Sequence, residues 1–185
     1  NTAMSLAMKQ LYSSEKHSHA APFLRAVWAR GMKLSCMAFA VARGNAGLNE
    51  ETAFLCGLMN EVGKLYVITK AEEFPELLGR KHSFEAVLEK WNSQISKSII
   101  ESWGFPDEVA QSADPNSYLD SDTELAPTYV DAVAVARLLV DQDQEGVAGF
   151  AGDPSSVKLG IDEKSVAGVM SAYRDKLKAM QQSLT

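Results

Sequence analysis

Apolar residues recur at every third or fourth position through most of the chain, which is the spacing of amphipathic helices. The first clear stretch covers residues 24–42, between Pro22 and Gly44. Proline is favoured in the first turn of a helix and glycine just beyond its end, so this stretch is predicted to be one helix. A second stretch covers residues 84–103 and stops at Gly104, which predicts another long helix.

Shorter helices are predicted between and after these two. Asn49 is a suitable N-cap for the helix that follows it, because two acidic residues occupy the first turn. Pro106 opens a short helix over residues 106–113. Residues 127–140 are apolar on nearly every side, which predicts a central buried helix.

The last part of the chain is predicted to contain a loop and a final helix. Residues 141–158 are rich in Gly and Asp and are expected to form a mobile loop. Periodic apolar positions then predict a helix over about residues 161–183, with Asp162 as its cap. No run of alternating β-branched residues indicates a strand. The expected fold is therefore a single all-α, multi-helix domain over residues 1–185.

Large apolar residues on the periodic stripes of these helices are expected to form the core. The five strongest candidates are Trp28, Leu58, Val62, Trp91 and Trp103. Leu58 and Val62 belong to a segment that mixes apolar and charged residues. Their burial will therefore show which side of that segment faces the interior.

The composition agrees with an ordinary globular domain and excludes some partners. Apolar residues make up 46% of the 185 residues and charged residues 23%. The formal net charge is −6 and the basic residues are scattered, so no nucleic-acid-binding patch is expected. No window is apolar over the roughly 20 residues that a membrane span requires. Cys36 and Cys56 fall on predicted buried faces, as small hydrophobic residues do in a reducing compartment, and a cytoplasmic location is expected.

The segment LCGLMNEVGKLY, residues 55–66, places charged residues inside an apolar stretch. As one continuous helix it has a broad apolar face, with Asn60, Glu61 and Lys64 on the opposite side. This arrangement is either the solvated face of an amphipathic helix or a polar island enclosed by other helices. The apolar flanks and two helix-weakening glycines, Gly57 and Gly63, favour enclosure, because glycine suggests the close approach of another helix.

The histidines indicate neither a metal site nor a catalytic site. His17 and His19 are two residues apart and point to different sides of a helix. They also lack cysteine or acidic neighbours at ligand spacing. His82 lies in the polar run GRKHS and is expected to face solvent or cap a helix. No catalytic residue, metal ligand or cofactor is assigned.

The segment NEETAFLCGLMNEVGKLY, residues 49–66, resembles the N-x-E-x-A-F-L-A-G-L-L-H-D-I-G-K-L stretch of HDOD domains, which are signalling relatives of the HD phosphohydrolases. Residues 23–42 are similar to the Trp-bearing helix of that family. Residues 87–113 resemble its L-L-x-x-W-x-L-P region, and residues 125–140 resemble its V-x-x-A-D-x-L helix. The resemblance covers most of residues 1–145. It implies an HD-like fold from which this chain lacks the amino-terminal helical segment.

The resemblance also implies where a metal site would lie and what replaces it. The metal-binding His–Asp pair of the HD relatives corresponds to Asn60 and Glu61. A divalent metal needs several converging oxygen or imidazole ligands, and arginines at two neighbouring positions would repel it. The chain is therefore expected to hold no metal and not to be an enzyme. The vestigial pocket is expected to consist of Arg30, Asn60, Glu61, Lys64, Asn92 and Arg137.

The function implied by the resemblance is that of a non-catalytic regulatory domain in bacterial signal transduction. Such a domain acts through protein contacts, with receiver, GGDEF or EAL modules as partners, or senses a small ligand in the vestigial pocket. The alternative is a divergent metal-dependent phosphohydrolase acting on nucleotides or cyclic dinucleotides. A binding module for a small anionic metabolite is a third interpretation. No nucleic-acid or membrane partner is expected.

One interaction in the pocket can be predicted in detail. Glu61 would be a carboxylate in a largely apolar surround, where an uncompensated charge costs several kcal/mol. We expect Arg30 or Arg137 to pair with it, because a guanidinium group meets a carboxylate with two hydrogen bonds and keeps its proton. In the alternative, both arginines extend to solvent. Together with Lys64 the pocket would hold three positive charges and one negative, an excess that would attract a phosphate or carboxylate ligand.

Overall fold

The computed structural model describes residues 20–45, 47–141 and 152–183, and every regular element within these ranges is a helix. The prediction of a single all-α domain is therefore confirmed. The predictions for His17 and His19, and for loop residues 142–151, lie outside the described residues. None of the helices in the described ranges combines the length and the hydropathy of a membrane span.

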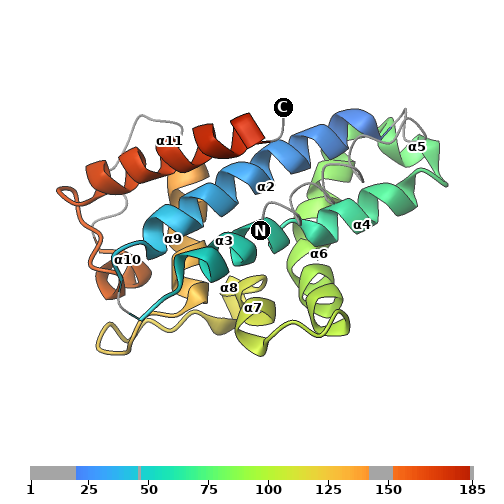
Figure 1. Cartoon of the computed structure of the whole chain (residues 1–185). Coiled ribbons are helices and arrows are strands. Elements are labelled where there is room, and N and C mark those ends of the chain that lie inside the picture. The colour runs from blue at the N-terminus through green and yellow to red at the C-terminus, as the bar shows by residue number, and fades with distance from the viewer. Residues whose placement is uncertain (1–19, 46, 142–151, 184–185) are drawn as a thin grey trace.

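The long helix α2, Ala21–Ala42, lies at the centre of the molecule (Figure 1). Pro22 occupies its first turn, and Gly44 follows its end with a φ of 90°, as the sequence predicts. Helix α2 packs against α3 (Glu50–Met59), α9 (Tyr129–Asp141) and α11 (Val166–Ser183).

A second group of helices covers one end of α2. Its main members are α4 (Val62–Ala71) and α6 (Lys81–Ser102), which pack against each other, with the short helix α5 (Pro75–Leu78) between them in sequence. Helices α7 (Asp107–Ser112) and α8 (Pro115–Tyr118) then lead the chain back to α9.

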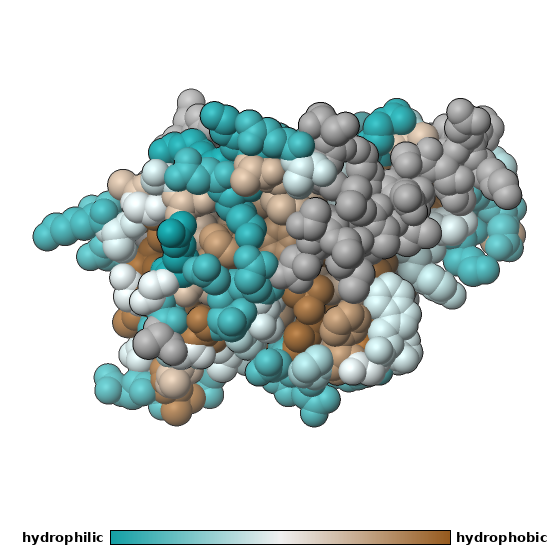
Figure 2. Space-filling model, in the orientation of Figure 1, coloured by the Kyte–Doolittle hydropathy of each residue, from teal (hydrophilic) through white to brown (hydrophobic). Residues whose placement is uncertain are grey.

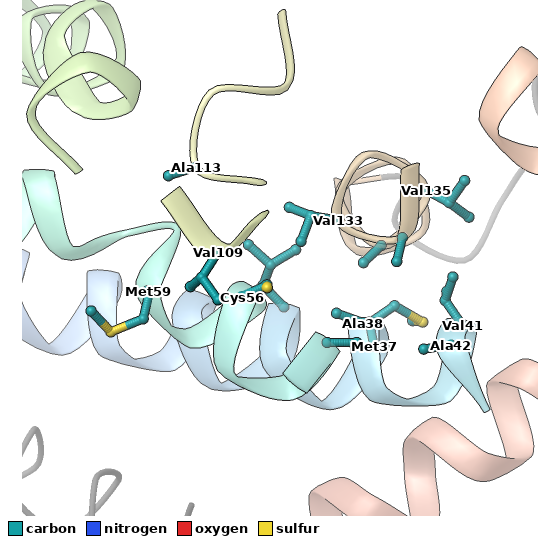
Figure 3. Packing of buried hydrophobic residues seen from close by; sticks show 14 of the residues in the cluster. Met37, Ala38, Val41, Ala42, Cys56, Met59, Val109, Ala113, Val133 and Val135 are labelled. Carbon is teal, nitrogen blue, oxygen red and sulfur yellow. The ribbon is translucent and has the colours of Figure 1, made fainter. Parts of the chain in front are cut away.

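The main core cluster is built from α2, α3, α7 and α9. Figure 3 shows Met37 of α2, Cys56 of α3, Val109 of α7 and Val133 of α9 within it. Each of these side chains is almost fully buried. Burial raises the pKa of the Cys56 thiol to about 12 and that of Cys36 to the same value, so both thiols stay protonated and pack as small hydrophobic groups.

The core prediction is confirmed for two of its five residues. Leu58 and Val62 are buried, and Trp28 is partly buried against two core clusters. The prediction is wrong for Trp91, which is 44% exposed, and for Trp103, which is 53% exposed.

The buried row of α6 explains this error. It consists of Phe84, Leu88, Asn92, Ser96 and Ile100. Two of these residues are polar, so the apolar periodicity of the sequence pointed to a neighbouring face of the helix. On the face drawn in Figure 2, brown hydrophobic residues reach the surface between teal and white ones.

The continuous helix predicted over residues 55–66 is also wrong. Helix α3 ends at Met59 and α4 begins at Val62, with Asn60 and Glu61 forming a turn between them. The change of direction moves Tyr66 off the expected apolar face, and its side chain is 50% exposed.

The predicted loop over residues 141–158 contains a short helix, α10, Pro154–Lys158. The Asp153 carboxylate caps it by accepting a hydrogen bond from the backbone N–H of Ser156 at 2.9 Å. Lys158 fixes it to α9 through a buried ion pair with Asp131, at 3.3 Å. The cap Asp153 followed by Pro154 is a helix-start signal that the composition of the segment concealed.

The last helix begins later than predicted. Helix α11 begins at Val166 instead of residue 161, and continues to Ser183. The Asp162 carboxylate caps the preceding turn by accepting hydrogen bonds from the N–H groups of Lys164 and Ser165.

Two helix contacts leave no room for a side chain. A Cβ atom on Gly63 would lie 2.5 Å from the carbonyl oxygen of Asn92 and 2.9 Å from the amide nitrogen of Ser96, both on α6. A Cβ atom on Gly57 would lie 2.6 Å from Ser35 Cα on α2. The backbone atoms of the neighbouring helices cannot give way cheaply, so these glycines set how closely the helices approach.

Replacement of Gly63 with alanine is expected to destabilise the protein by about 1–3 kcal/mol, because overpacking forces the helices apart. Urea unfolding followed by circular dichroism measures the change. Gly168→Ala is the matched control, since Gly168 lies in α11 with open space around it. There the higher helix propensity of alanine should stabilise the protein by up to about 1 kcal/mol. Equal effects at the two sites would contradict the close-contact interpretation.

Candidate functional site

The turn between α3 and α4 is held by polar side chains of α6. Asn92 Nδ2 donates a hydrogen bond to the carbonyl oxygen of Asn60 at 2.8 Å, and Ser96 Oγ donates to the same oxygen at 3.2 Å. At the start of α4 the N–H of Gly63 donates to Ser96 Oγ at 2.8 Å, and the N–H of Lys64 donates to Asn92 Oδ1 at 3.0 Å. Asn92 and Ser96 therefore cap α4 from another helix and satisfy backbone groups that the turn would otherwise leave unpaired.

Asn60 contributes its own side chain to this turn. The side chain is fully buried, and its Nδ2 donates a hydrogen bond to the carbonyl oxygen of Ser112, at the end of α7, at 3.2 Å. Its Oδ1 atom is buried and accepts no hydrogen bond from the described residues. The position that resembles the histidine of the HD pair thus links α3 to α7.

Glu61 is buried between two cations. Arg30 Nε of α2 donates a hydrogen bond to Glu61 Oε1 at 3.2 Å, and Lys64 Nζ lies 2.9 Å from Glu61 Oε2. The contact with Lys64 has the distance of an ion pair but not the alignment of a hydrogen bond, and Oε2 accepts no aligned hydrogen bond within the described chain. The predicted pairing of Glu61 with an arginine is therefore confirmed for Arg30.

Two further carboxylates extend the pair into a network. Arg30 also donates hydrogen bonds to the carboxylate of Asp141 at the end of α9. Lys64 Nζ lies 2.5 Å from Glu89 Oε1 on α6. We call the series Asp141–Arg30–Glu61–Lys64–Glu89 the charged chain; its signs alternate, and it joins α2, the α3–α4 turn, α4, α6 and α9.

Asp141 and Glu89 change the predicted charge balance of the pocket. Arg137 is half-buried on α9 and forms no ion pair with Glu61; it acts electrostatically on Asp141 instead. With Arg30, Lys64 and Arg137 as cations, Glu61, Asp141 and Glu89 supply an equal number of negative charges. The expected excess of positive charge is therefore wrong, because sequence periodicity alone does not bring α6 and the end of α9 to this point.

The pKa directions follow from these contacts. The hydrogen bond from Arg30 lowers the pKa of the Asp141 carboxyl group below its ordinary value, against the smaller opposing effect of burial. The same hydrogen bond raises the pKa of Arg30. Both groups are therefore held in their charged forms.

The residues at this site do not fit a divalent metal. Both oxygens of Glu61 face cations, and Asn92 Oδ1 already accepts a hydrogen bond from the backbone N–H of Lys64. Within the described residues, Asn60 Oδ1 is the one uncharged oxygen of this set that accepts no hydrogen bond, whereas a hard cation requires about six oxygen ligands. Within the described residues, no three His, Cys, Asp or Glu side chains are grouped so that they could hold a metal ion.

Comparison with known proteins gives a family and a fold. The model of the HDOD domain family matches residues 1–116. A search of curated proteins found no match. Among solved structures, a protein of Shewanella amazonensis SB2B described as a putative metal-dependent phosphohydrolase aligns with a TM-score of 0.75 and 23% sequence identity. The alignment covers 99% of this chain and 67% of the other.

This structural likeness corrects one expectation from the sequence. The sequence predicts that the chain is not an enzyme, whereas the fold is shared with a protein described as a putative metal-dependent phosphohydrolase. The prediction is contradicted by that finding and is withdrawn. The error arose because the loss of metal ligands at one site was extended to the activity of the whole chain.

Removal of the Lys64 charge tests the electrostatics of the charged chain. Lys64→Met is expected to lower the free energy of unfolding by about 3 kcal/mol, because Glu61 would keep only the part-exposed Arg30 as a partner. Lys70→Met is the matched control, since Lys70 lies in the same helix and pairs with Glu73 at the same i,i+3 spacing, but is exposed. Its effect should stay below about 0.5 kcal/mol.

The double variant Glu61→Gln with Lys64→Met should recover part of the Lys64→Met loss, because no uncompensated carboxylate remains in the interior. Urea unfolding of wild type, Glu61→Gln, Lys64→Met and the double variant measures the coupling free energy between the two residues. Additive effects of the two substitutions would show that Glu61 and Lys64 do not interact.

The stability of the protein in acid should depend on Asp141. The pKa of this residue is lowered in the folded state. Its contribution to the free energy of unfolding is therefore complete above the unfolded pKa of about 4 and is lost as the pH falls through the lower pKa of the folded state. Asp141→Asn should therefore destabilise the protein at neutral pH, and the difference from wild type should shrink in acid. Urea midpoints measured along a pH series check this. In an Arg30→Met background, Asp141→Asn should lose this pH dependence.

Proposed function

Because the chain belongs to the HDOD domain family, we propose that it is a regulatory domain of bacterial signal transduction that acts through contacts with other protein modules. Receiver, GGDEF and EAL modules are the proposed partners, and the cytoplasm is the proposed location. The proposal rests on the contacts that Asn60 and Glu61 make. By resemblance they occupy the positions of the metal-binding pair, and here both serve contacts between helices.

The local chemistry favours a structural use of this site. Glu61 and Lys64 are both buried, so neither presents a reactive group to solvent. Of Arg30, Glu61 and Lys64, Arg30 is the residue that reaches the surface, with 29% of its side chain exposed. A buried ion pair contributes more to the choice of one helix arrangement than to net stability in the best-attested cases. We therefore assign the charged chain the role of fixing the helix arrangement that partners contact.

The partly exposed Arg30 is also a place where a small anionic ligand could bind. A phosphate or carboxylate group reaching Arg30 from solvent would compete with Asp141 for its guanidinium group. The balanced charges of the site make this a weaker attraction than the sequence alone predicts. Thermal melting with added inorganic phosphate tests it: a midpoint that rises for wild type but not for Arg30→Met would place anion sensing at this residue.

The second candidate function is a metal-dependent phosphohydrolase acting on nucleotides or cyclic dinucleotides. The observation that favours it is the fold shared with the Shewanella protein of that description. The donor set at Glu61 does not support a metal, so no catalytic step is derived from it. Direct assay separates this candidate from the first.

Glu61→Gln discriminates between the two candidates. Binding of purified receiver, GGDEF and EAL modules to the chain is measured by calorimetry, and hydrolysis of nucleotides and cyclic dinucleotides is measured with added Mn²⁺ or Mg²⁺. For a regulatory domain, at least one module should bind. Glu61→Gln should weaken this binding only as far as it disturbs the helix arrangement, because the Glu61 side chain is buried and cannot contact a partner directly. The regulatory proposal fails if no module binds. Turnover that Glu61→Gln abolishes, with bound metal, would establish the phosphohydrolase instead.

A further inference from the structure

Helix α6 carries an apolar face that is partly exposed to solvent. A groove of about 550 Å³ runs along it. The residues that line this groove are Tyr66, Trp91, Gln94, Ile95, Ser98, Ile99 and Ser102. Apart from Tyr66 of α4, all of them belong to α6.

The groove exposes large aromatic side chains. Trp91 is 44% exposed, Tyr66 is 50% exposed, and Ile95 and Ile99 are only partly buried. Contiguous exposed apolar residues of this kind mark interaction sites, and tryptophan and tyrosine are enriched among the residues that dominate binding energy.

The charges beside the groove form a self-complementary pattern. Lys90 and Glu101 are both exposed. They are eleven residues apart, which is close to three helical turns, so they lie on the same side of α6. Glu101 also lies 3.9 Å from Lys97 of its own helix, an exposed contact that contributes little. The pattern therefore places a positive charge at one end of this side and a negative charge at the other.

Two antiparallel copies of α6 would bring these charges together. A two-fold axis between Ile95 and Ser96 places Lys90 of each copy opposite Glu101 of the other, because the two positions are equally far from that axis. The same symmetry places Ile95 beside the axis and Trp91 at the level of Ile99 and Ser102 of the second copy. Apolar contacts then fill the centre and two charge pairs close the rim, as in an isologous interface.

We propose that the groove on α6 binds the same groove of a second copy of this chain, with the two helices antiparallel. The inference goes beyond the proposed function and does not depend on it, since none of the five residues of the charged chain lines the groove. A second groove between α4, α5 and α6 lacks the pattern, because its charged lining residues, Lys70 and Arg80, have the same sign. That groove exposes Phe74, at 52%, and supplies a matched control.

Sedimentation equilibrium of the 185-residue chain, over micromolar to sub-millimolar concentrations, measures the association. Wild type should form a reversible dimer. Lys90→Glu and Glu101→Lys should each raise the dissociation constant about tenfold, because symmetry turns two weak attractions into two repulsions. The double variant, Lys90→Glu with Glu101→Lys, should restore the wild-type affinity. Circular dichroism melts confirm that each variant is folded.

Trp91→Glu and Phe74→Glu complete the design. The first should abolish the dimer, and the second, at a similarly exposed aromatic residue in the other groove, should leave it intact. A chain that is monomeric at every concentration overturns the proposal and leaves the groove to a different partner. A double charge variant that does not recover affinity overturns the antiparallel arrangement, and dissociation by Phe74→Glu but not by Trp91→Glu overturns the assignment to α6.

Discussion

The arrangement of the helices depends on one interrupted helix. A continuous helix through residues 50–71 would satisfy its own backbone hydrogen bonds, whereas the turn at Asn60 and Glu61 releases carbonyl and N–H groups into the interior. Unpaired, such groups cost about as much as a lost hydrogen bond each. Asn92 and Ser96 of α6 pair with them, so α6 must lie against this turn, and the rest of the second helix group follows from its position.

Charge follows from the same geometry. The turn directs Glu61 into the interior, where its carboxylate needs cations from two different helices. Each of those cations then contacts a more exposed carboxylate. The alternation of sign limits the cost of burying charge, because each ion of the series lies next to ions of opposite charge only. The site is thus better described as an internal cross-link than as an open pocket.

The sequence predicted the local features of this protein, such as helix ends, better than it predicted contacts between residues far apart in the chain. Proline and glycine positions correctly predicted the limits of α2, and the N-cap Asn49 correctly predicted the start of α3. The pairing of Glu61 with Arg30 was also foreseen, because a buried carboxylate requires a cation. Periodicity failed at Trp91, since α6 buries Asn92 and Ser96 for their hydrogen bonds. The roles of Glu89 and Asp141 depend on helix packing and had no local signal.

The sequence separations within the charged chain have a kinetic consequence. Arg30 and Glu61 are 31 residues apart, Lys64 and Glu89 are 25 apart, and Arg30 and Asp141 are 111 apart. Contacts of such high separation close large loops and form only after much of the chain has been ordered. We therefore expect the contact between Arg30 and Asp141, at the end of α9, to form late in folding. Interactions that form after the transition state govern the rate of unfolding more than the rate of folding, so this contact acts mainly to prolong the lifetime of the folded state.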